Sequence, residues 1–343
     1  MPSSNSPRVS VLVPAYNAAG TIEESLLTIL AQSLTDIEII AVNDGSTDAT
    51  GTILDRLAVR DGRLQPRHIE HTGLIGALNH GLNLCQGEYV ARFDADDRAA
   101  PTRLEKQIAF LDLNSEIDAV GCQIRCFPDN LVAEGFRVYE AWINSLITPE
   151  EIAREIYIES PLVHPTVTIR RKILMEIGGY EEHGWPEDYD LWLRLHTAGA
   201  RFAKIPEVLH EWRESEDRLT RTDSRYSVEN FIRAKVHYLM RGPLKHRKQT
   251  IIWGAGQMGR RISKHLLRGG AELVAFVDID PKKIGNTRRG VPIISPDDLP
   301  GVAAGVDRPW VLVAVPSRGA RSLIRENLNH LGWEEGSDYI CVA

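Results

Sequence analysis

Short apolar runs alternate with amphipathic stretches over the first hundred residues of the chain. The apolar runs have the length of buried strands and end in polar or turn-forming residues; they are residues 9–13, 37–42 and 89–93. The amphipathic stretches carry apolar side chains at helical spacing; they are residues 21–32, 49–59 and 74–84. Strands that alternate with helices in this way predict a parallel sheet covered by helices on both faces.

A second α/β unit is predicted to begin near residue 250. An amphipathic helix is expected over residues 227–241, and the basic segment RGPLKHRKQ after it is broken by Gly and Pro. The pattern then gives a strand, a helix and two more strands, at residues 250–253, 258–267, 273–277 and 311–315. We therefore expect one domain over residues 1–241, a linker over 242–249 and a smaller domain over 250–343.

Composition and charge narrow the functional classes. A chain of 343 residues with 43% hydrophobic and 25% charged residues is typical of a globular protein of about two domains. The net charge of −7 gives no general attraction for nucleic acid, so no nucleic-acid partner is expected. Four scattered cysteines predict buried thiols, and neither a signal peptide nor a membrane span is recognisable. We expect a cytoplasmic protein, and the sequence leaves peripheral contact with the inner membrane face open.

Three carboxylates follow the strand predicted at residues 89–93. The segment YVARFDADD places Asp94, Asp96 and Asp97 at the carboxyl end of that strand, where open α/β sheets bind ligands. Clustered carboxylates can hold Mg²⁺ or Mn²⁺ and, through the ion, the oxygens of a diphosphate. The same residue types are common in turns and helix caps, so this segment alone leaves both interpretations open.

Polar residues also end the first two strands. Asp44 ends EIIAVND, and its carboxylate can accept hydrogen bonds from the imide of a nucleobase. Pro14, Ala15 and Tyr16 follow the first strand, and their backbone and ring can flank the same base. The alternative is an ordinary turn, because the residues of NDGS are all turn formers.

A third acidic group precedes an apolar helical run in WPEDYDLWLRL. It consists of Glu187, Asp188 and Asp190, with Trp185 beside it. Acidic residues are common at helix N-termini for electrostatic reasons. The functional interpretation is that one carboxylate is a general base and that the indole stacks on a sugar ring.

In their order and spacing, these segments together resemble the family-2 glycosyltransferases from residue 9 to about residue 227. The matching segments are VSVLVPAYN, VNDGSTD, GLIGALNHGL, GEYVARFDADD, HPTVTIRR, GGY and EDYDLWLRL. The resemblance implies a GT-A fold, with a mixed and mainly parallel sheet between helices. It also implies an inverting, metal-dependent transfer from a nucleotide sugar, commonly a UDP-sugar. The acceptor would be a glycan or a lipid-linked glycan in the synthesis of bacterial surface polysaccharide or glycoconjugates.

The resemblance also assigns roles to single residues. Asp44 would contact the base, Asp94 the ribose side of the donor, and Asp96 the metal ion. Asp188 would be the catalytic base, with Asp190 as the alternative. Three residues would lie near the acceptor, namely His164, Trp185 and Glu187. The other donor contacts would come from Pro14, Ala15, Tyr16, Gly73, Arg213, Arg218 and Arg221.

The chain departs from the family pattern at two places. It reads HTGL where the family often has Asn and a small or basic residue before Gly-Leu. Many members follow the last strand of the site with Tyr-Arg-x-His, whose His can complete the metal shell, whereas this chain has WRES, so that Ser215 stands in that place. Arg213, Arg218 and Arg221, in a loop expected over residues 213–225, would then neutralise the diphosphate.

The second unit carries a dinucleotide-binding pattern. Gly254, Gly256 and Gly259 follow a predicted strand and open a helix, and Asp278 ends the next strand. The pattern predicts a Rossmann-like domain that could hold NAD(P) or a nucleotide. No Tyr-x-x-x-Lys pair accompanies it, so a binding or structural role is favoured over catalysis.

Two other functional classes stay open. One is a non-catalytic protein that senses nucleotide or NAD through the second unit. The other is a sugar nucleotidyltransferase, which would have a Gly-rich loop directly after the first strand, where this chain has VPAYNAAG. Slow hydrolysis of a nucleotide-sugar donor would distinguish a glycosyltransferase from a sensor.

Overall fold

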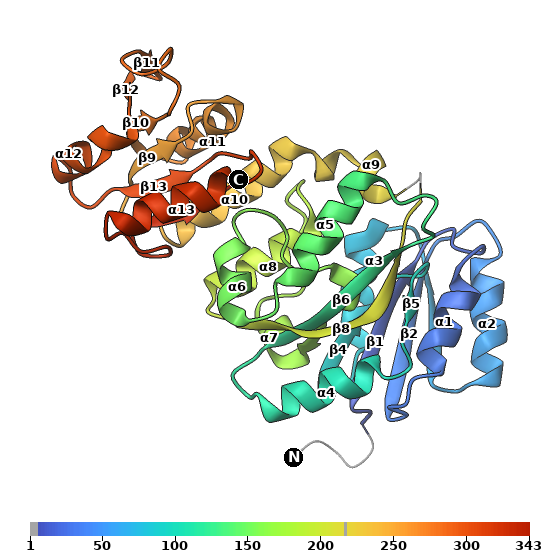
Figure 1. Cartoon of the computed structure of the whole chain (residues 1–343). Coiled ribbons are helices and arrows are strands. Elements are labelled where there is room, and N and C mark those ends of the chain that lie inside the picture. Colours follow the sequence, from blue (N-terminus) through green and yellow to red (C-terminus); the bar gives the residue numbers. More distant parts are fainter. Residues whose placement is uncertain (1–5, 216–217) are drawn as a thin grey trace. The chain divides into compact units, whose positions relative to one another are not determined.

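The chain forms two compact units. The computed structural model describes residues 6–215 and 218–343 (Figure 1). Unit 1 comprises Met1–Ala153, Pro161–His183 and Ala198–Thr222, and unit 2 comprises Arg154–Ser160, Gly184–Thr197 and Asp223–Ala343. The linker expected at residues 242–249 lies within unit 2: residues 242–248 connect α10 (Val228–Arg241) to β9 (Gln249–Trp253), and Gln249 already belongs to the strand.

A mixed sheet forms the centre of unit 1. Its order among the described residues is β3-β2-β1-β4-β7-β6-β8-β5. The strands are β1 (Val9–Ala15), β2 (Ile37–Asp44), β3 (Leu64–Ile69), β4 (Tyr89–Arg92), β5 (Arg98–Ala99), β6 (Ala119–Phe127), β7 (Thr168–Arg170) and β8 (Phe202–Arg213). Strands β3, β2, β1 and β4 are parallel to one another, β6 is parallel to β8, and β7 is antiparallel to both of its neighbours. The prediction of a mixed, mainly parallel sheet is therefore confirmed.

Helices cover both faces of this sheet, as the sequence predicts (Figure 1). The helices of unit 1 are α1 (Ile22–Leu30), α2 (Thr50–Arg60), α3 (Gly73–Leu84), α4 (Arg103–Leu113), α5 (Glu134–Ser145), α7 (Arg171–Glu176), the short α9 (Leu219–Thr222) and α6 (Pro149–Glu155), whose last residues belong to unit 2. Because side chains alternate along a strand, Val11 faces the core shared with α1, α2 and α4. Leu12 faces the other way and touches α3, where a Cβ added to Gly81 would lie 2.3 Å from it.

Two elements of unit 1 differ from the prediction. Strand β3 was not expected, because its sequence LQPRHI is polar and contains Pro66, which is tolerated only at a sheet edge. The loop expected over residues 213–225 is wrong as a description of that whole segment. It begins with the last residue of β8 and contains α9 and a short 3₁₀ turn, η2 (Ser224–Tyr226).

Unit 2 has a sheet of its own, in the order β11-β12-β10-β9-β13-β14. Besides β9, its strands are β10 (Glu272–Val277), β11 (Thr287–Arg288), β12 (Val291–Ile294), β13 (Trp310–Val313) and β14 (Tyr339–Cys341). All neighbouring pairs are parallel except β11 with β12. The helices α11 (Gln257–Arg268), α12 (Leu299–Ala304) and α13 (Ala320–His330) connect these strands. That this α/β unit is Rossmann-like stays a prediction.

Helix α10 joins α8 (Glu187–Thr197) to the sheet-bearing part of unit 2. The ring of Phe231 on α10 lies 5.4 Å from that of Tyr189 on α8. Glu229, also on α10, forms ion pairs with Lys264 and His265 of α11. The helix with the acidic motif EDYD therefore belongs to the same body as the second sheet.

All four cysteines are buried free thiols, as predicted. None of the helices in the described residues has the length and apolarity that a membrane span requires.

Candidate functional site

The loops after β1 and β2 are tied together at one edge of the unit 1 sheet. The backbone N–H of Asn17 donates to Ser46 Oγ at 2.9 Å, and the N–H of Thr47 donates to Asn17 Oδ1 at 2.8 Å. Since β1, β2 and β4 are parallel, the ends of all three strands meet at this edge. The structure thus brings Ala15, Asp44 and the DADD segment together, as the sequence predicts.

Asp44 is a buried carboxylate beside an exposed aromatic ring. It is 3% exposed, and its Oδ1 accepts hydrogen bonds from the N–H of Thr72 at 2.7 Å and from its hydroxyl at 3.1 Å. Its Oδ2 lies 2.9 Å from Nδ1 of His71. Tyr16, 49% exposed, stacks on His71 with ring centroids 4.3 Å apart. Gly73 follows at the start of α3.

His71 is a residue that the sequence reasoning missed as part of this site. The available signal was the departure from the family pattern at HTGL. The structure shows that this departure supplies an imidazole between Asp44 and Tyr16. Together these side chains form a polar and aromatic platform at the strand ends.

The DADD segment forms a compact acidic cluster. One carboxylate oxygen from each of Asp94, Asp96 and Asp97 lies within 4.8 Å of the others. Burial and the neighbouring charges of Asp97 and Asp94 raise the pKa of Asp96 to about 8. A divalent cation would relieve this crowding of negative charge, and carboxylate oxygens are the ligands that Mg²⁺ and Mn²⁺ prefer. The residues present therefore fit the predicted metal ion.

Two of these three carboxylates are held by side chains or backbone of unit 1. Asp97 accepts from the backbone N–H of Arg213 at 2.7 Å, and its Oδ2 lies 2.8 Å from Nε2 of His210. Asp94 pairs with Arg92 at 2.5 Å. Among the contacts described for the cluster, Asp96 has no such ion pair, which leaves its carboxylate as the one most available to a metal ion.

His210 was also missed in the sequence. The family pattern directed attention to a His after Trp-Arg, where Ser215 stands. In this chain a buried His lies earlier, within β8 at the start of HEWR, and it contacts Asp97. A His inside a predicted strand gives little signal, because its contact with Asp97 depends on the antiparallel pairing of β5 with β8.

The three arginines expected around the diphosphate have partners in unit 1. Arg213 donates to the backbone carbonyl of Asp96 at 2.5 Å and pairs with Glu24 at 2.6 Å. Arg218 and Arg221 both pair with the buried Glu214, at 3.0 and 2.7 Å. Arg221 belongs to α9, so its ion pair connects this helix to the residue that follows β8. Residues 216–217 of the same segment lie outside the described residues.

The acceptor contact expected for His164 is not supported. Its side chain is 6% exposed, and its Nε2 lies 2.9 Å from the hydroxyl of Tyr180. Burial lowers the pKa of His164 well below the usual value, so the ring is neutral. The residue is part of the interior of unit 1.

On α8, in unit 2, Asp190 is fully engaged by other side chains. It is 0% exposed. Its Oδ1 accepts from the indole N–H of Trp185 and from the hydroxyl of Tyr238, both at 2.7 Å. Its Oδ2 accepts from Nε of Arg194 at 2.8 Å. Trp185 is itself buried against His237, so the expected stacking of this indole on a sugar is not supported.

Asp188 has a different environment on the same helix. Its side chain is partly exposed, whereas Glu187 is buried and accepts from the hydroxyl of Tyr226 at 2.8 Å. Surrounding protein, together with the charges of Glu187 and Glu159, raises the pKa of Asp188 to about 8. A carboxylate with a pKa in this range can take a proton near neutral pH.

Comparison with known proteins agrees with these features. The sequence model of the family described as "Glycosyl transferase family 2" matches residues 10–178, and a second model, "C2185-like, N-terminal", matches residues 246–336. The putative glycosyltransferase EpsE of Bacillus subtilis is 33% identical over 234 residues, which are 67% of this chain and 81% of that protein. The amylovoran biosynthesis glycosyltransferase AmsE of Erwinia amylovora is 31% identical, over 61% of this chain and 77% of its own length.

A solved structure shows the same fold at lower identity. The crystal structure of TarS residues 1–349 from S. aureus, in complex with UDP-GlcNAc, superposes with a TM-score of 0.57. It is 20% identical and matches 76% of this chain and 72% of the TarS chain. The chain matches the family model, and it is more than 30% identical to glycosyltransferases most of whose length it covers. It therefore belongs to the family-2 glycosyltransferases.

Proposed function

We propose that this glycosyltransferase moves a sugar from a UDP-sugar to a hydroxyl group of a glycan or lipid-linked acceptor, with inversion at the sugar carbon. The reaction would serve the synthesis of bacterial surface polysaccharide or glycoconjugates. The observation that carries the proposal is the cluster of three carboxylates at the end of β4, on the same sheet edge as Asp44 and Tyr16.

The platform after β1 and β2 has the chemistry to bind the nucleobase. The exposed ring of Tyr16 offers a face for stacking, and His71 supports that ring from behind at 4.3 Å. Asp44 is held in place by Thr72 and His71, and a carboxylate oxygen can accept a further hydrogen bond from the N–H of a uracil imide. The proposal therefore assigns the base to this platform.

The acidic cluster is proposed to hold the diphosphate end of the donor. A Mg²⁺ or Mn²⁺ ion on Asp96 would supply positive charge that stabilises the departing diphosphate. Arg213 fixes the backbone carbonyl of Asp96, while Arg92 and His210 hold Asp94 and Asp97. These contacts limit the movement of the loop that presents Asp96.

Asp188 is proposed as the base that activates the acceptor. A sugar hydroxyl is a weak nucleophile, and proton removal by a carboxylate accelerates such steps by about 10²–10⁴-fold. The proton passes from the acceptor hydroxyl to Asp188 while the new C–O bond forms and the bond to the diphosphate oxygen breaks. Asp190 is not proposed for this role, because three donors already occupy its two oxygens.

Donor hydrolysis tests the proposal without knowledge of the acceptor. The whole chain is incubated with UDP-glucose, UDP-galactose, UDP-GlcNAc and GDP-mannose, each with Mn²⁺ or with EDTA, and released nucleotide is measured. We expect slow release from at least one UDP-sugar, only with Mn²⁺, that is lost in Asp96→Asn but kept in the surface control Asp36→Asn. Release of nucleotide that is equal in EDTA, or equal in Asp96→Asn, would contradict the assignment of the metal site.

A further inference from the structure

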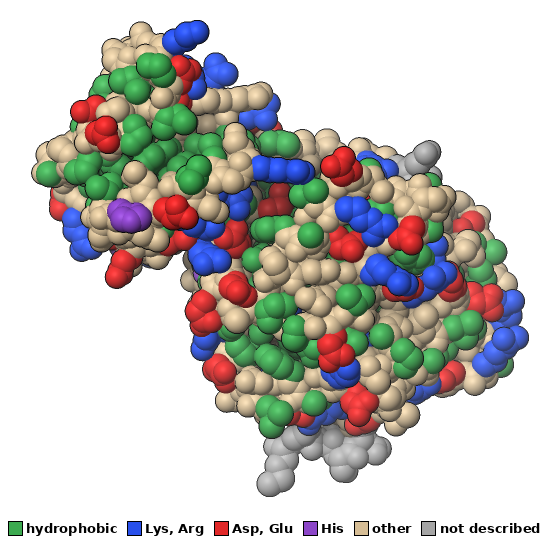
Figure 2. Space-filling model, viewed as in Figure 1, with side chains coloured by type: hydrophobic (Ala, Val, Ile, Leu, Met, Phe, Trp, Pro, Cys, Tyr) green, Lys and Arg blue, Asp and Glu red, His purple; other side chains and the backbone are tan. Residues whose placement is uncertain are grey.

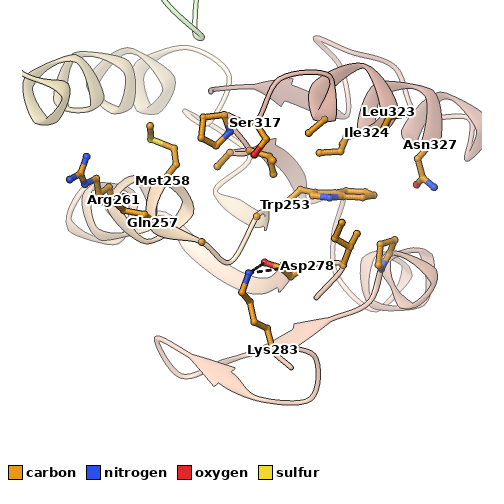
Figure 3. A pocket seen from close by; sticks show the side chains of 18 residues that line it. Trp253, Gln257, Met258, Arg261, Asp278, Lys283, Ser317, Leu323, Ile324 and Asn327 are labelled. Atoms are coloured by element: carbon orange, nitrogen blue, oxygen red, sulfur yellow. Dashed lines mark hydrogen bonds and ion pairs between the residues drawn. The ribbon is translucent and has the colours of Figure 1, made fainter. Parts of the chain in front are cut away.

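Unit 2 contains a cavity of about 580 Å³ at the carboxyl ends of its central strands. Trp253 and Gly254 line it at the end of β9, Asp278 lines it after β10, and Ala314 lines it after β13. These strands are parallel neighbours, and β9 lies between the other two. Open α/β sheets bind ligands at this edge, where the direction of strand order reverses. Helices α11 and α13 flank the cavity (Figure 3).

The three glycines at the cavity have different roles. Gly254 has a φ of +116°, and a Cβ there would lie 2.9 Å from the carbonyl oxygen of Ala314. A Cβ on Gly259 would lie 1.8 Å from the carbonyl oxygen of Gly254. Backbone packing therefore requires both of these glycines. Gly256 differs, because a Cβ added to it meets no atom within 4 Å. It lines the cavity directly before α11, so open space faces the first turn of that helix.

Asp278 is already occupied by groups of the chain. Its Oδ2 accepts from the backbone N–H of Ala255 at 3.0 Å, and its Oδ1 accepts from that of Asp280 at 3.0 Å. The ammonium group of Lys283 pairs with the same carboxylate at 3.1 Å (Figure 3). In dinucleotide sites an acidic residue at this position accepts a ribose hydroxyl. In this chain Lys283 balances its charge and adds a cationic donor that lines the cavity.

Apolar side chains also line the cavity, and some of them are exposed. Leu323 and Ile324 come from α13 (Figure 3), and Ile279 follows Asp278 in the chain. Ile279 is 78% exposed and Leu323 is 67% exposed, although both are large apolar side chains. On the face viewed in Figure 2, hydrophobic side chains gather over the C-terminal part of the chain. A flat heterocyclic ring that covers such side chains would remove apolar surface from water.

We propose that this cavity is a second nucleotide site, which takes a nucleoside diphosphate group without a metal ion. The phosphates would lie before the first turn of α11, whose free N–H groups and dipole favour an anion, and close to Lys283. The base would cover exposed apolar side chains of the cavity lining, such as Ile279 or Leu323. The group can come from a free nucleoside diphosphate, from a nucleotide sugar, or from the ADP half of a dinucleotide. The site belongs to unit 2, whereas the donor site proposed above belongs to unit 1.

Calorimetry on the whole chain in EDTA tests this site, because chelation removes the metal on which the proposed donor site depends. UDP, ADP and NAD⁺ are titrated separately. Lys283→Met removes the cationic donor, and Gly256→Val fills the open space before α11 with a side chain that meets no atom of the protein at its Cβ. Lys282→Met and Gly301→Val are matched controls outside the cavity lining, and the Cβ position of Gly301 is equally free of neighbours.

We expect UDP or ADP to bind in EDTA with one site per chain. Loss of a charge-assisted contact should weaken binding by about tenfold or more in Lys283→Met. Gly256→Val should weaken it at least as much, and the two controls should bind like the wild type. NAD⁺ binding with the same dependence on Lys283 would identify the dinucleotide as the source of the diphosphate group.

Two results would overturn the proposal. One is the absence of binding for all three nucleotides in EDTA, and the other is unchanged affinity in both Gly256→Val and Lys283→Met. Asp96→Asn separates this outcome from the donor proposal. That variant should keep the binding seen in EDTA and lose only the additional binding seen with Mn²⁺.

Discussion

Replacing Asp190 by Asn is expected to destabilise unit 2 strongly, although the change is nearly isosteric. Asp190 is fully buried and accepts hydrogen bonds from Trp185, Tyr238 and Arg194 at 2.7–2.8 Å. An Asn has one acceptor oxygen, and its amide nitrogen would face a donor that the carboxylate had satisfied. The buried guanidinium of Arg194 would also lose its counter-charge.

The size of the effect follows from these contacts. Removing one partner of a buried ion pair costs about 3–5 kcal/mol, because the other charge stays buried. Since every 1.4 kcal/mol corresponds to a factor of ten, local opening of this region should become about 10²- to 4 × 10³-fold more frequent. The affected elements are α8 and α10, which Asp190 and Tyr238 connect.

Hydrogen exchange followed by mass spectrometry measures this opening region by region. Peptides from α8 and α10 should exchange faster in Asp190→Asn, and peptides from β1 and β2 in unit 1 serve as the internal reference. Asp188→Asn is the matched control on the same helix. Because the folded protein raises the pKa of Asp188 to about 8, folding favours its protonated form, and stability falls as pH rises from about 4 to about 8.

An Asn at position 188 resembles the protonated acid, so Asp188→Asn should leave protection at pH 7 unchanged or increase it. Equal protection in the two variants would refute the reasoning. Faster exchange confined to Asp188→Asn would show that the roles of the two carboxylates had been exchanged.

Three further predictions concern the metal site and the base. Asp96→Asn should remove the Mn²⁺-dependent part of UDP binding in calorimetry, and a variant that binds as tightly as wild type would take Asp96 out of the metal site. His210→Gln should weaken Mn²⁺ binding by about 10–100-fold, since it alters the side chain that holds the carboxylate of Asp97. Electron paramagnetic resonance of free Mn²⁺ measures this affinity, and an unchanged affinity would contradict a positioning role for His210. The rate of donor hydrolysis should rise with pH up to about 8 and then level off, because Asp188 must lose its proton to act as a base. The same dependence of the rate on pH in Asp188→Asn would contradict that role.

The elements that could be predicted are those whose apolar periodicity is strong. The buried strands β1 and β2 and the helices α1 and α2 that follow them have bounds within a few residues of the expected ones. Strand β3 could not be predicted in this way, because an edge strand with Pro66 exposes most of its side chains and so has no apolar pattern. Helix α9 is short, and the ion pair of its Arg221 with Glu214 is a contact that the residue pattern does not reveal.

The candidate site was predictable where a motif marks a strand end. Asp44 ends β2, and the DADD segment follows β4. Both of these strands pair with β1. The contacts of His210 and Asp190 were not predictable, because their partners are distant in the chain. Asp97 lies 113 positions from His210, and Tyr238 lies 48 positions from Asp190. The same holds for the grouping of α8 with unit 2, which depends on packing against α10.

A single-turnover measurement on Asp188→Asn tests the proposed glycosyl transfer most directly. Enzyme in excess over a UDP-sugar that the donor screen identifies is mixed with Mn²⁺, and the rate of UDP release and the dissociation constant of the donor are both measured. Loss of the base should lower the rate by about 10²-fold or more while the dissociation constant stays within a factor of two or so of the wild-type value. A rate equal to that of the wild type would contradict the role of Asp188 and, with it, the proposed mechanism.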